Sequence, residues 1–478
     1  MARRRTAGFA AGRFEVPKVP DYVVAELRYD SRVAVSAARG RFEAPAAAEG
    51  TARGLNELLA GFRIKRVASH FGMSERKLAA RAAPPGARAR MTADFAQGGV
   101  VQIVPRDAKD AARIAARLRR SKAVWNAYVA PRPVPAQAPE GSSTTSRNFE
   151  PAQGYLHSAP DGIGAMEVWG RAGGKGRGVT ICDIEGNWNT SHEDLPAGIP
   201  LFGGTVIATP DWRNHGTAVL GEMVSKPGTS GTVGIAHEAR AATHSAIVGG
   251  VFNTAAAIMG AAARLGAGDV ILIELQATGP NGKYVAMQYW DDVFSAIMAA
   301  TARGITVVEA AGNGDENFDL PVFAGTGLQK DSGAIVVGAG IPPTNFFDSF
   351  GFGAAMPGYS TIGVPRSRIW FSNYGRIVNV HGWGWHVTTC GYGDAQGGAE
   401  NRWYTHRFSG TSSASPIVTG AAAVLQGIAK ATNGAPLTPA KVRSILMGSG
   451  TPQVAGPGVP LSQRIGPLPN LAKAAKLV

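Results

Sequence analysis

Four short runs of apolar residues, rich in Val and Ile, constrain the fold of this chain most. They span residues 178–184, 269–275, 305–311 and 334–339. Unbroken runs of this length are typical of strands that are buried on both faces of a parallel sheet. Between them, residues 255–265 and 290–303 have the apolar spacing of helices that could connect parallel strands. The pattern predicts an α/β fold, with functional groups at the carboxyl ends of its strands.

The charge of the chain divides it near residue 150. The net charge is +14, and residues 1–150 carry all of it, with 27 Lys and Arg against 13 Asp and Glu. Residues 151–478 hold 21 of each kind. The segment 130–148 has the Pro, Ser and Thr content of an extended linker. We therefore predict a basic module at 1–135, a linker at 136–152 and a mostly parallel α/β domain at 153–478.

The front module is predicted to be a small α+β unit. Strands are expected at 22–28, 99–105 and 124–129, and helices at 54–71 and 107–121. The second helix is rich in Arg, but no stacked aromatic residues or helix-turn-helix spacing accompany it. We therefore interpret the charge as a solvated or docking face, with nucleic-acid binding by residues 1–150 as the alternative.

Composition excludes several classes of protein. Two cysteines, Cys182 and Cys390, cannot form a disulfide framework or a cysteine-rich zinc site. No window reaches the ~18 apolar residues that a membrane helix needs. The Arg-rich N-terminus lacks the apolar stretch of a secretory signal, so the sequence does not assign a compartment.

Four polar residues stand at the ends of predicted strands or the starts of predicted helices. Asp183 ends a strand, where its carboxylate could accept a hydrogen bond from an imidazole. His215 opens an apolar helix, and Ser412 lies just before another helix, whose N-terminus would favour a developing negative charge. Asn313 follows a third strand and could donate to an oxyanion. Singly, such a His is more often a cap, and such an Asn usually serves the turn.

Together, these residues and their surroundings resemble one family. The segments ICDIEG, HGTAVLG, AAGNG and GTSSASP resemble the motifs of subtilisin-like serine proteases, the subtilases, and occur in the same order. The resemblance implies a serine endopeptidase in which Ser412 attacks the peptide carbonyl, His215 transfers the proton and Asp183 orients His215. It further implies that Asn313 and the Ser412 backbone N–H stabilise the oxyanion, and that the FSNYG segment at 371–375 has a structural role. No cofactor is expected for this chemistry.

The chain departs from the family pattern at two places. Subtilases usually have a small residue and a glycine after the Asp, whereas here Ile184 and Glu185 precede Gly186. The Ser-Leu-Gly motif that usually lies beside the substrate is replaced here by Glu, Leu and Gln at positions 274–276. The residues expected to border the substrate are Glu274, Leu275, Ala310 and Gly312.

A second unexpected carboxyl, Glu309, lies on the strand before Asn313. If its strand neighbours that of Glu274, the two groups could share a proton or select a basic substrate side chain. The alternative is that each carboxyl faces its own structural partner.

The resemblance has three further implications. The cluster Asp315, Glu316 and Asp319 could hold structural calcium, with a solvated acidic loop as the alternative. The front module would be a prodomain, an intramolecular inhibitor and folding aid that is cut away in the linker at roughly 135–155. Proteases of this kind are commonly exported. The alternative function is a non-catalytic protein or peptide binder on the same fold.

Overall fold

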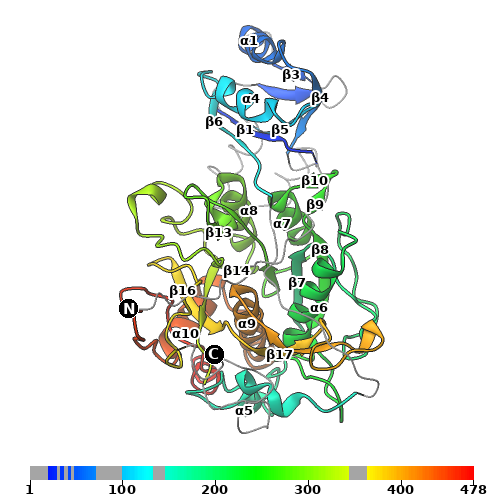
Figure 1. Cartoon of the computed structure of the whole chain (residues 1–478), viewed down its shortest axis with the longest axis vertical. Coiled ribbons are helices and arrows are strands. Elements are labelled where there is room, and N and C mark those ends of the chain that lie inside the picture. The colour runs from blue at the N-terminus through cyan, green and yellow to red at the C-terminus, as the bar shows by residue number, and fades with distance from the viewer. Residues whose placement is uncertain are drawn as a thin grey trace, which may run out of the picture.

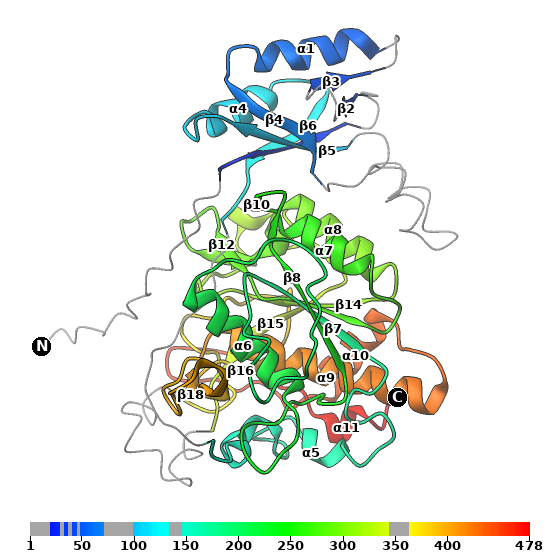
Figure 2. The ribbon, with the colours of Figure 1, turned by 90° about the vertical axis from the view of Figure 1, so that its right-hand side faces the viewer.

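The computed structural model describes residues 20–28, 33–36, 41–44, 48–70, 99–132, 146–343 and 363–478. These residues form a small front module and a larger α/β domain, which lie one above the other in Figures 1 and 2. Residues 136–145 of the predicted linker lie outside the described residues.

In the part of the front module that the structure describes, an antiparallel sheet carries two helices. Its strand order is β4-β5-β1-β6, formed by β1 (Val23–Leu27), β4 (Ile64–Ser69), β5 (Val100–Pro105) and β6 (Val124–Val129). The helices are α1 (Glu49–Leu59) and α4 (Asp110–Leu118), and a short hairpin joins β2 (Ala34–Ser36) to β3 (Arg41–Glu43). Leu55 of α1 and Ile114 of α4 pack on the sheet in one core. The order of the main elements is β-α-β-β-α-β, a split βαβ arrangement.

The predicted helix over 54–71 is wrong in its second half. The helix ends at Leu59, and the chain then forms β4, which pairs with β5. Gly61 favours the break, and β-branched Ile64 and Val67 favour the strand. The apolar spacing continued across this boundary, so periodicity alone could not place it.

The larger domain is built on a six-stranded sheet in which every neighbouring pair is parallel. The order is β16 (Val378–Trp383), β15 (Ile335–Gly340), β14 (Thr306–Ala310), β11 (Val270–Ile273), β7 (Thr180–Glu185) and β8 (Arg240–Ser245). The four central strands are those predicted from the apolar runs, and the predicted fold class is confirmed. The outer strands β8 and β16 contain more polar residues, which hid them from the same reasoning.

Helices cover both faces of this sheet (Figure 2). One layer contains α7 (Thr254–Ala262) and α8 (Asp291–Thr301), and the other contains α6 (Pro210–Val224), α9 (Thr411–Asn433) and α10 (Pro439–Ser449). Ile271 and Ile273 of β11 pack in the α7–α8 layer, whereas Leu272 packs in the α6–α9 layer. Alternate residues of a strand thus serve opposite layers.

The remaining elements lie around this core. Two short helices are α5 (Ala165–Val168) and α11 (Leu471–Ala474). Three hairpins pair β9 (Ile247–Val248) with β10 (Val251–Phe252), β12 (Gln276–Thr278) with β13 (Tyr284–Ala286), and β17 (Val387–Cys390) with β18 (Tyr404–Phe408). Within the described part of the chain, no helix has both the length and the hydrophobicity that a membrane crossing requires.

The front module docks at the N-terminal ends of α7 and α8. Asp292, in the first turn of α8, accepts a hydrogen bond from the Tyr128 hydroxyl at 2.6 Å and contacts Nε2 of His70 at 2.7 Å. Asn253, the N-cap of α7, donates to the His70 carbonyl at 2.7 Å. Burial raises the pKa of Asp292, but the bonds from His70 and Tyr128 outweigh it and lower that pKa. A negative charge at the start of α8 is also favoured by the helix dipole.

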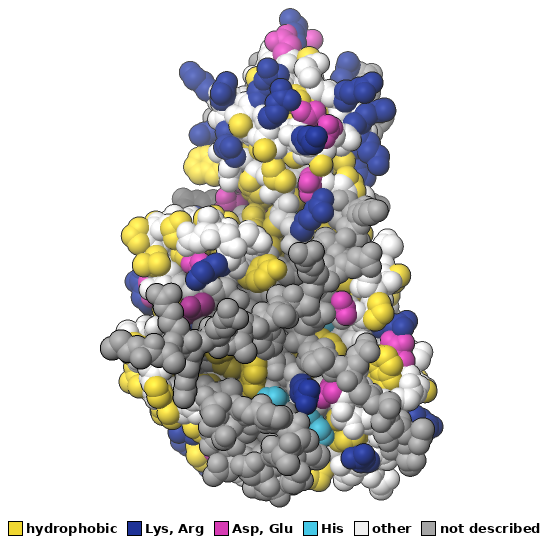
Figure 3. All heavy atoms as spheres, viewed as in Figure 1, with side chains coloured by type: hydrophobic (Ala, Val, Ile, Leu, Met, Phe, Trp, Pro, Cys, Tyr) yellow, Lys and Arg dark blue, Asp and Glu magenta, His cyan; other side chains and the backbone are white. Residues whose placement is uncertain are grey.

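Lys and Arg side chains gather over the front module in Figure 3. Several of them make contacts within the module. The guanidinium groups of Arg113 and Arg117 lie over the Phe62 ring, at 5.4 and 5.2 Å from its centroid. Arg119 donates to the Ala127 carbonyl at 2.6 Å. These contacts are those of a charged face that stabilises its own module.

Candidate active site

His215 and Glu185 form the closest polar pair of the site. Nδ1 of His215, on α6, lies in direct contact with Oε1 of Glu185, the last residue of β7, and both side chains are completely buried. Asp183 stands two residues earlier on the same strand, but its Oδ2 accepts a hydrogen bond from Nε1 of Trp188 at 2.7 Å. The prediction that Asp183 contacts His215 is therefore wrong, and Glu185 occupies that position.

The strand geometry explains why the sequence left this choice open. Side chains two apart on a strand leave the same face, so Asp183 and Glu185 both point toward the α6–α9 layer. Room for Glu185 comes from Gly216, where a Cβ atom would lie 2.3 Å from Oε2 of Glu185. One sequence signal did favour Glu185: it is followed at once by a small residue, Gly186, as the acid of the family pattern is.

Burial controls the protonation of this pair. It lowers the pKa of His215 to about 3 and raises the pKa of Glu185 well above its usual value. The imidazole is therefore uncharged at neutral pH. A proton on Nδ1, facing Glu185, leaves Nε2 as an acceptor, and Nε2 is buried with no hydrogen-bond partner among the described residues. This is the form in which an imidazole can act as a general base.

Ser412 lies in the first turn of α9, which begins at Thr411. The helix therefore starts earlier than the sequence suggested, because Gly410, with φ of 110°, makes the turn before it. At this position the backbone N–H of Ser412 has no acceptor within the helix. The ring of His215 packs edge-on against Phe408, at 5.2 Å between centroids, on the strand that leads into α9.

The structure brings Ser412 and His215 to one region without a bond between them. Their helices, α6 and α9, pack against each other. Among the described residues, Nε2 of His215 makes no hydrogen bond, to the Ser412 hydroxyl or otherwise. Glu274 acts on the same region, since hydrogen bonding with Ser412 lowers the pKa of Glu274.

Asn313 is held beside the start of α9. Its Oδ1 accepts hydrogen bonds from the backbone N–H of Thr411 at 2.8 Å and from the Thr411 hydroxyl at 3.0 Å. Because these bonds hold Oδ1 against Thr411, they leave the amide Nδ2 to donate elsewhere. Oε1 of Gln276 accepts from the backbone N–H of Asn313 at 2.7 Å. The sequence analysis missed Gln276 as a positioning residue, since no local signal links it to the Asn313 loop.

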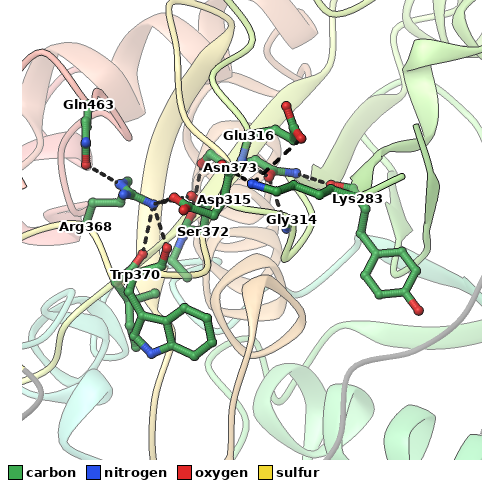
Figure 4. A network of polar contacts seen from close by, with 12 residues as sticks. Lys283, Gly314, Asp315, Glu316, Arg368, Trp370, Ser372, Asn373 and Gln463 are labelled. Carbon is green, nitrogen blue, oxygen red and sulfur yellow. Dashed lines mark hydrogen bonds and ion pairs between the residues drawn. The ribbon is translucent and has the colours of Figure 1, made fainter. Parts of the chain in front are cut away.

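The loop that carries Asn313 is fastened by Asn373 (Figure 4). Oδ1 of Asn373 accepts from the backbone N–H of Gly314 at 3.1 Å and of Glu316 at 2.8 Å. Its Nδ2 donates to the carbonyls of Ala311 at 2.7 Å and Tyr284 at 2.9 Å. Asn373 belongs to the FSNYG segment, for which the resemblance implied a structural role. These four bonds clamp the loop on both sides of Asn313.

Replacing Asn373 by alanine is expected to lower the free energy of unfolding by about 3–5 kcal/mol, because four backbone groups lose a buried partner. Urea unfolding would measure this, in a Ser412→Ala background that prevents self-digestion. The matched control is Asn317→Ala, whose side chain accepts one bond, from Asp319 at the surface. A loss below about 1 kcal/mol for Asn373→Ala would contradict the clamp.

The residues expected to border the substrate lie deeper than the sequence suggested. Glu274, Leu275 and Ala310 are buried side chains, and the backbone N–H of Gly312 donates to the Thr411 hydroxyl at 3.1 Å. Glu274 faces the α6–α9 layer, where it contacts the hydroxyl of Ser415. It is therefore placed beside the serines rather than in an open pocket that could select a basic side chain.

Glu309 belongs to the opposite layer. Its strand does neighbour that of Glu274, with Glu309 in register with Ile273. Its Oε1 accepts from the backbone N–H of Gln288 at 2.8 Å, and burial raises its pKa to about 8. The hypothesis of a shared proton is wrong, because consecutive register positions point to opposite faces of the sheet. Each carboxyl has its own structural partner.

The three carboxylates of the expected calcium cluster have separate partners. Asp315 pairs with Arg368 at 2.9 Å and Asp319 with Arg376 at 3.1 Å, while Glu316 accepts from Asn281 at 2.9 Å. The described ranges contain no group of three His, Cys, Asp or Glu arranged to hold a metal ion. Structural calcium stays a prediction from the resemblance.

The comparison with known families agrees with this architecture. The model of the Subtilase family matches residues 176–466. Among solved structures, the chain is similar to a protease from Pseudoalteromonas arctica PAMC 21717, with 19% identity, a TM-score of 0.48, and coverage of 70% of this chain and 100% of that one. It is also similar to the prenylagaramide maturation protease PagA, with 20% identity, a TM-score of 0.45, and coverage of 66% and 98%. No curated protein matches. The family match spans more than half of the chain, which therefore belongs to the subtilase family.

Proposed function

We propose that the chain is a serine endopeptidase whose catalytic acid is Glu185. Ser412 is the nucleophile, His215 the general base and acid, and Glu185 the group that orients His215. The observation that carries this proposal is the direct contact between Glu185 and Nδ1 of His215, which leaves Nε2 as a free acceptor. Membership of the family supports serine-type peptide hydrolysis in general.

The proposed reaction begins with attack by Oγ of Ser412 on the peptide carbonyl carbon. As that bond forms, the Ser412 proton passes to Nε2 of His215, and Glu185 stabilises the resulting imidazolium through Nδ1–H. His215 then gives the proton to the leaving amine, which departs and leaves an acyl-enzyme. Water repeats the sequence, with His215 as its base, and frees the acid product.

Two donors are proposed to stabilise the tetrahedral oxyanion. One is the backbone N–H of Ser412, which has no partner within α9, and the other is Nδ2 of Asn313. The bonds from Thr411 to Oδ1 of Asn313 support this assignment, because they turn the amide donor away from Thr411. The first turn of a 23-residue helix adds a favourable dipole at the same place.

We also propose that the front module is a prodomain that inhibits the enzyme until the linker is cut. The contacts of His70 and Tyr128 with Asp292 support stable docking. The strand β6, which carries Tyr128, leads directly into the linker. Its polypeptide substrates would therefore include its own chain.

The test compares the full-length chain with Ser412→Ala. The wild type is expected to hydrolyse labelled casein and to lose the front module by cleavage at roughly 135–155. The variant should lose about 10⁴-fold or more of the activity and keep its full mass. Casein hydrolysis by the pure variant at the wild-type rate would contradict the serine mechanism. Trimming of the pure variant at that rate would contradict self-processing alone.

A further inference from the structure

Glu274 lies beneath the start of α9, directly after β11. Its side chain is completely buried, and Oε1 contacts the hydroxyl of Ser415. Oε2 is also buried and has no hydrogen-bond partner among the described residues. The carboxyl interacts with the Ser412 hydroxyl as well. A buried carboxyl group therefore lies beneath the helix start that carries Ser412.

A count of protons indicates which form of Glu274 is present. The Ser415 hydroxyl also lies 2.7 Å from the backbone carbonyl of Thr411, which can only accept. A hydroxyl has one proton, so with an ionised Glu274 it can serve only one of these two acceptors. A protonated Glu274 satisfies both contacts, because the acid donates to Oγ of Ser415 and the Ser415 hydroxyl donates to the Thr411 carbonyl. The two contacts together therefore favour the neutral acid.

The surroundings of Glu274 favour the same form. The titratable groups that act on it from neighbouring elements are all acids: Asp183 and Glu185 on β7, and Glu222 on α6. The groups from α9 are the hydroxyls of Ser412 and Ser415. Burial raises the pKa of Glu274 well above its usual value, Asp183 and Glu185 add to this rise, and hydrogen bonding with the two serines offsets part of it.

The state of Glu274 matters because the Ser412 proton has two possible destinations. Nε2 of His215 must accept it during attack, which is the point where this inference rests on the proposed function. The oxygen of a neutral acid is a weak competitor, whereas a carboxylate accepts a hydrogen bond roughly twice as strongly. A carboxylate beneath Ser412 would also place a negative charge near the developing oxyanion.

We propose that Glu274 is a proton-dependent positioning residue, whose neutral form supports Ser415 and leaves the Ser412 proton to His215, and whose ionised form shuts the enzyme off. The direction of the pH effect on activity follows from the titration of an acid. The neutral form is present below the raised pKa of Glu274, and its proton is lost as the pH rises through that pKa. Activity should therefore fall on the alkaline side.

Glutamine is the matched variant, because its amide copies the neutral acid: N–H donates to Ser415 and the carbonyl oxygen faces Ser412. The experiment measures kcat/KM for a peptide substrate, and the rate of reaction with a fluorophosphonate, from neutral to alkaline pH. Circular dichroism identifies the range in which each protein stays folded. At neutral pH, Glu274→Gln should keep activity to within about 3-fold of the wild type.

The expected result is a wild type that loses activity at alkaline pH while still folded, and a Glu274→Gln variant without that loss. Profiles of the same shape for the two proteins would overturn the inference. A loss of 100-fold or more in Glu274→Gln at neutral pH would also overturn it, because it would mean that a charged carboxylate is needed. A folded wild type without any hydrolysis or fluorophosphonate reaction would instead contradict the proposed function.

Discussion

Changing Glu185 to glutamine is expected to lower kcat/KM about 10⁴-fold, whereas Asp183→Asn should lower it less than about 10-fold. An amide at position 185 cannot stabilise the imidazolium, and it can hold His215 in the wrong tautomer. Asp183 accepts a bond from Trp188, and the carbonyl oxygen of an asparagine can accept the same bond. Peptide hydrolysis by both purified variants would measure the two effects.

The two acids are matched controls for each other, because both are buried on the same face of β7. Thermal unfolding should show that both variants are folded before their rates are compared. A 10⁴-fold loss in Asp183→Asn with near-normal activity in Glu185→Gln would reverse the assignment.

The Asn313→Ala variant should lose about 10²–10³-fold in kcat, with KM changed by less than about 3-fold. The expected split arises because Nδ2 of Asn313 would donate to an oxygen that is negatively charged only in the tetrahedral state. Steady-state kinetics on one peptide substrate would separate kcat from KM.

Gln276→Ala is the control for the Asn313→Ala variant. The side chain of Gln276 accepts a hydrogen bond from the backbone N–H of Asn313 and holds that residue indirectly, so its loss should reduce kcat by about 10-fold or less. If Asn313→Ala raised KM and left kcat unchanged, Asn313 would be a substrate-binding residue and not an oxyanion donor.

The parts of the fold that were predictable from sequence are those with a local cause. The central strands β7, β11, β14 and β15 are unbroken apolar runs because helices cover both faces of the sheet. The edge strand β4 lies on the front-module sheet and has only one well-buried residue, Val67, so its pattern resembled a continuation of α1. Because edge strands are partly exposed, they lack the unbroken apolar run that identifies a central strand.

The residues of the candidate site also divide into those with a local sequence signal and those without one. Asn313 follows β14 as the sequence suggested, and Ser412 lies in the first turn of α9. His215 does not open its helix as predicted, because α6 begins at Pro210 and His215 lies in its second turn. The choice between Asp183 and Glu185 depends on where α6 lies above β7, which is a tertiary property. The meeting of Glu274 with the serines joins residues about 140 positions apart, and no local pattern could predict it.

Mapping the reaction of the purified active form with a fluorophosphonate tests the central claim, an activated Ser412, most directly. Oγ of the nucleophile displaces fluoride from phosphorus and leaves a stable adduct that mass spectrometry can locate. The account predicts one adduct per chain, on Ser412, and a reaction at least about 10³-fold slower in His215→Ala. A folded wild type that stays unlabelled, or that carries the adduct on another residue, would contradict it.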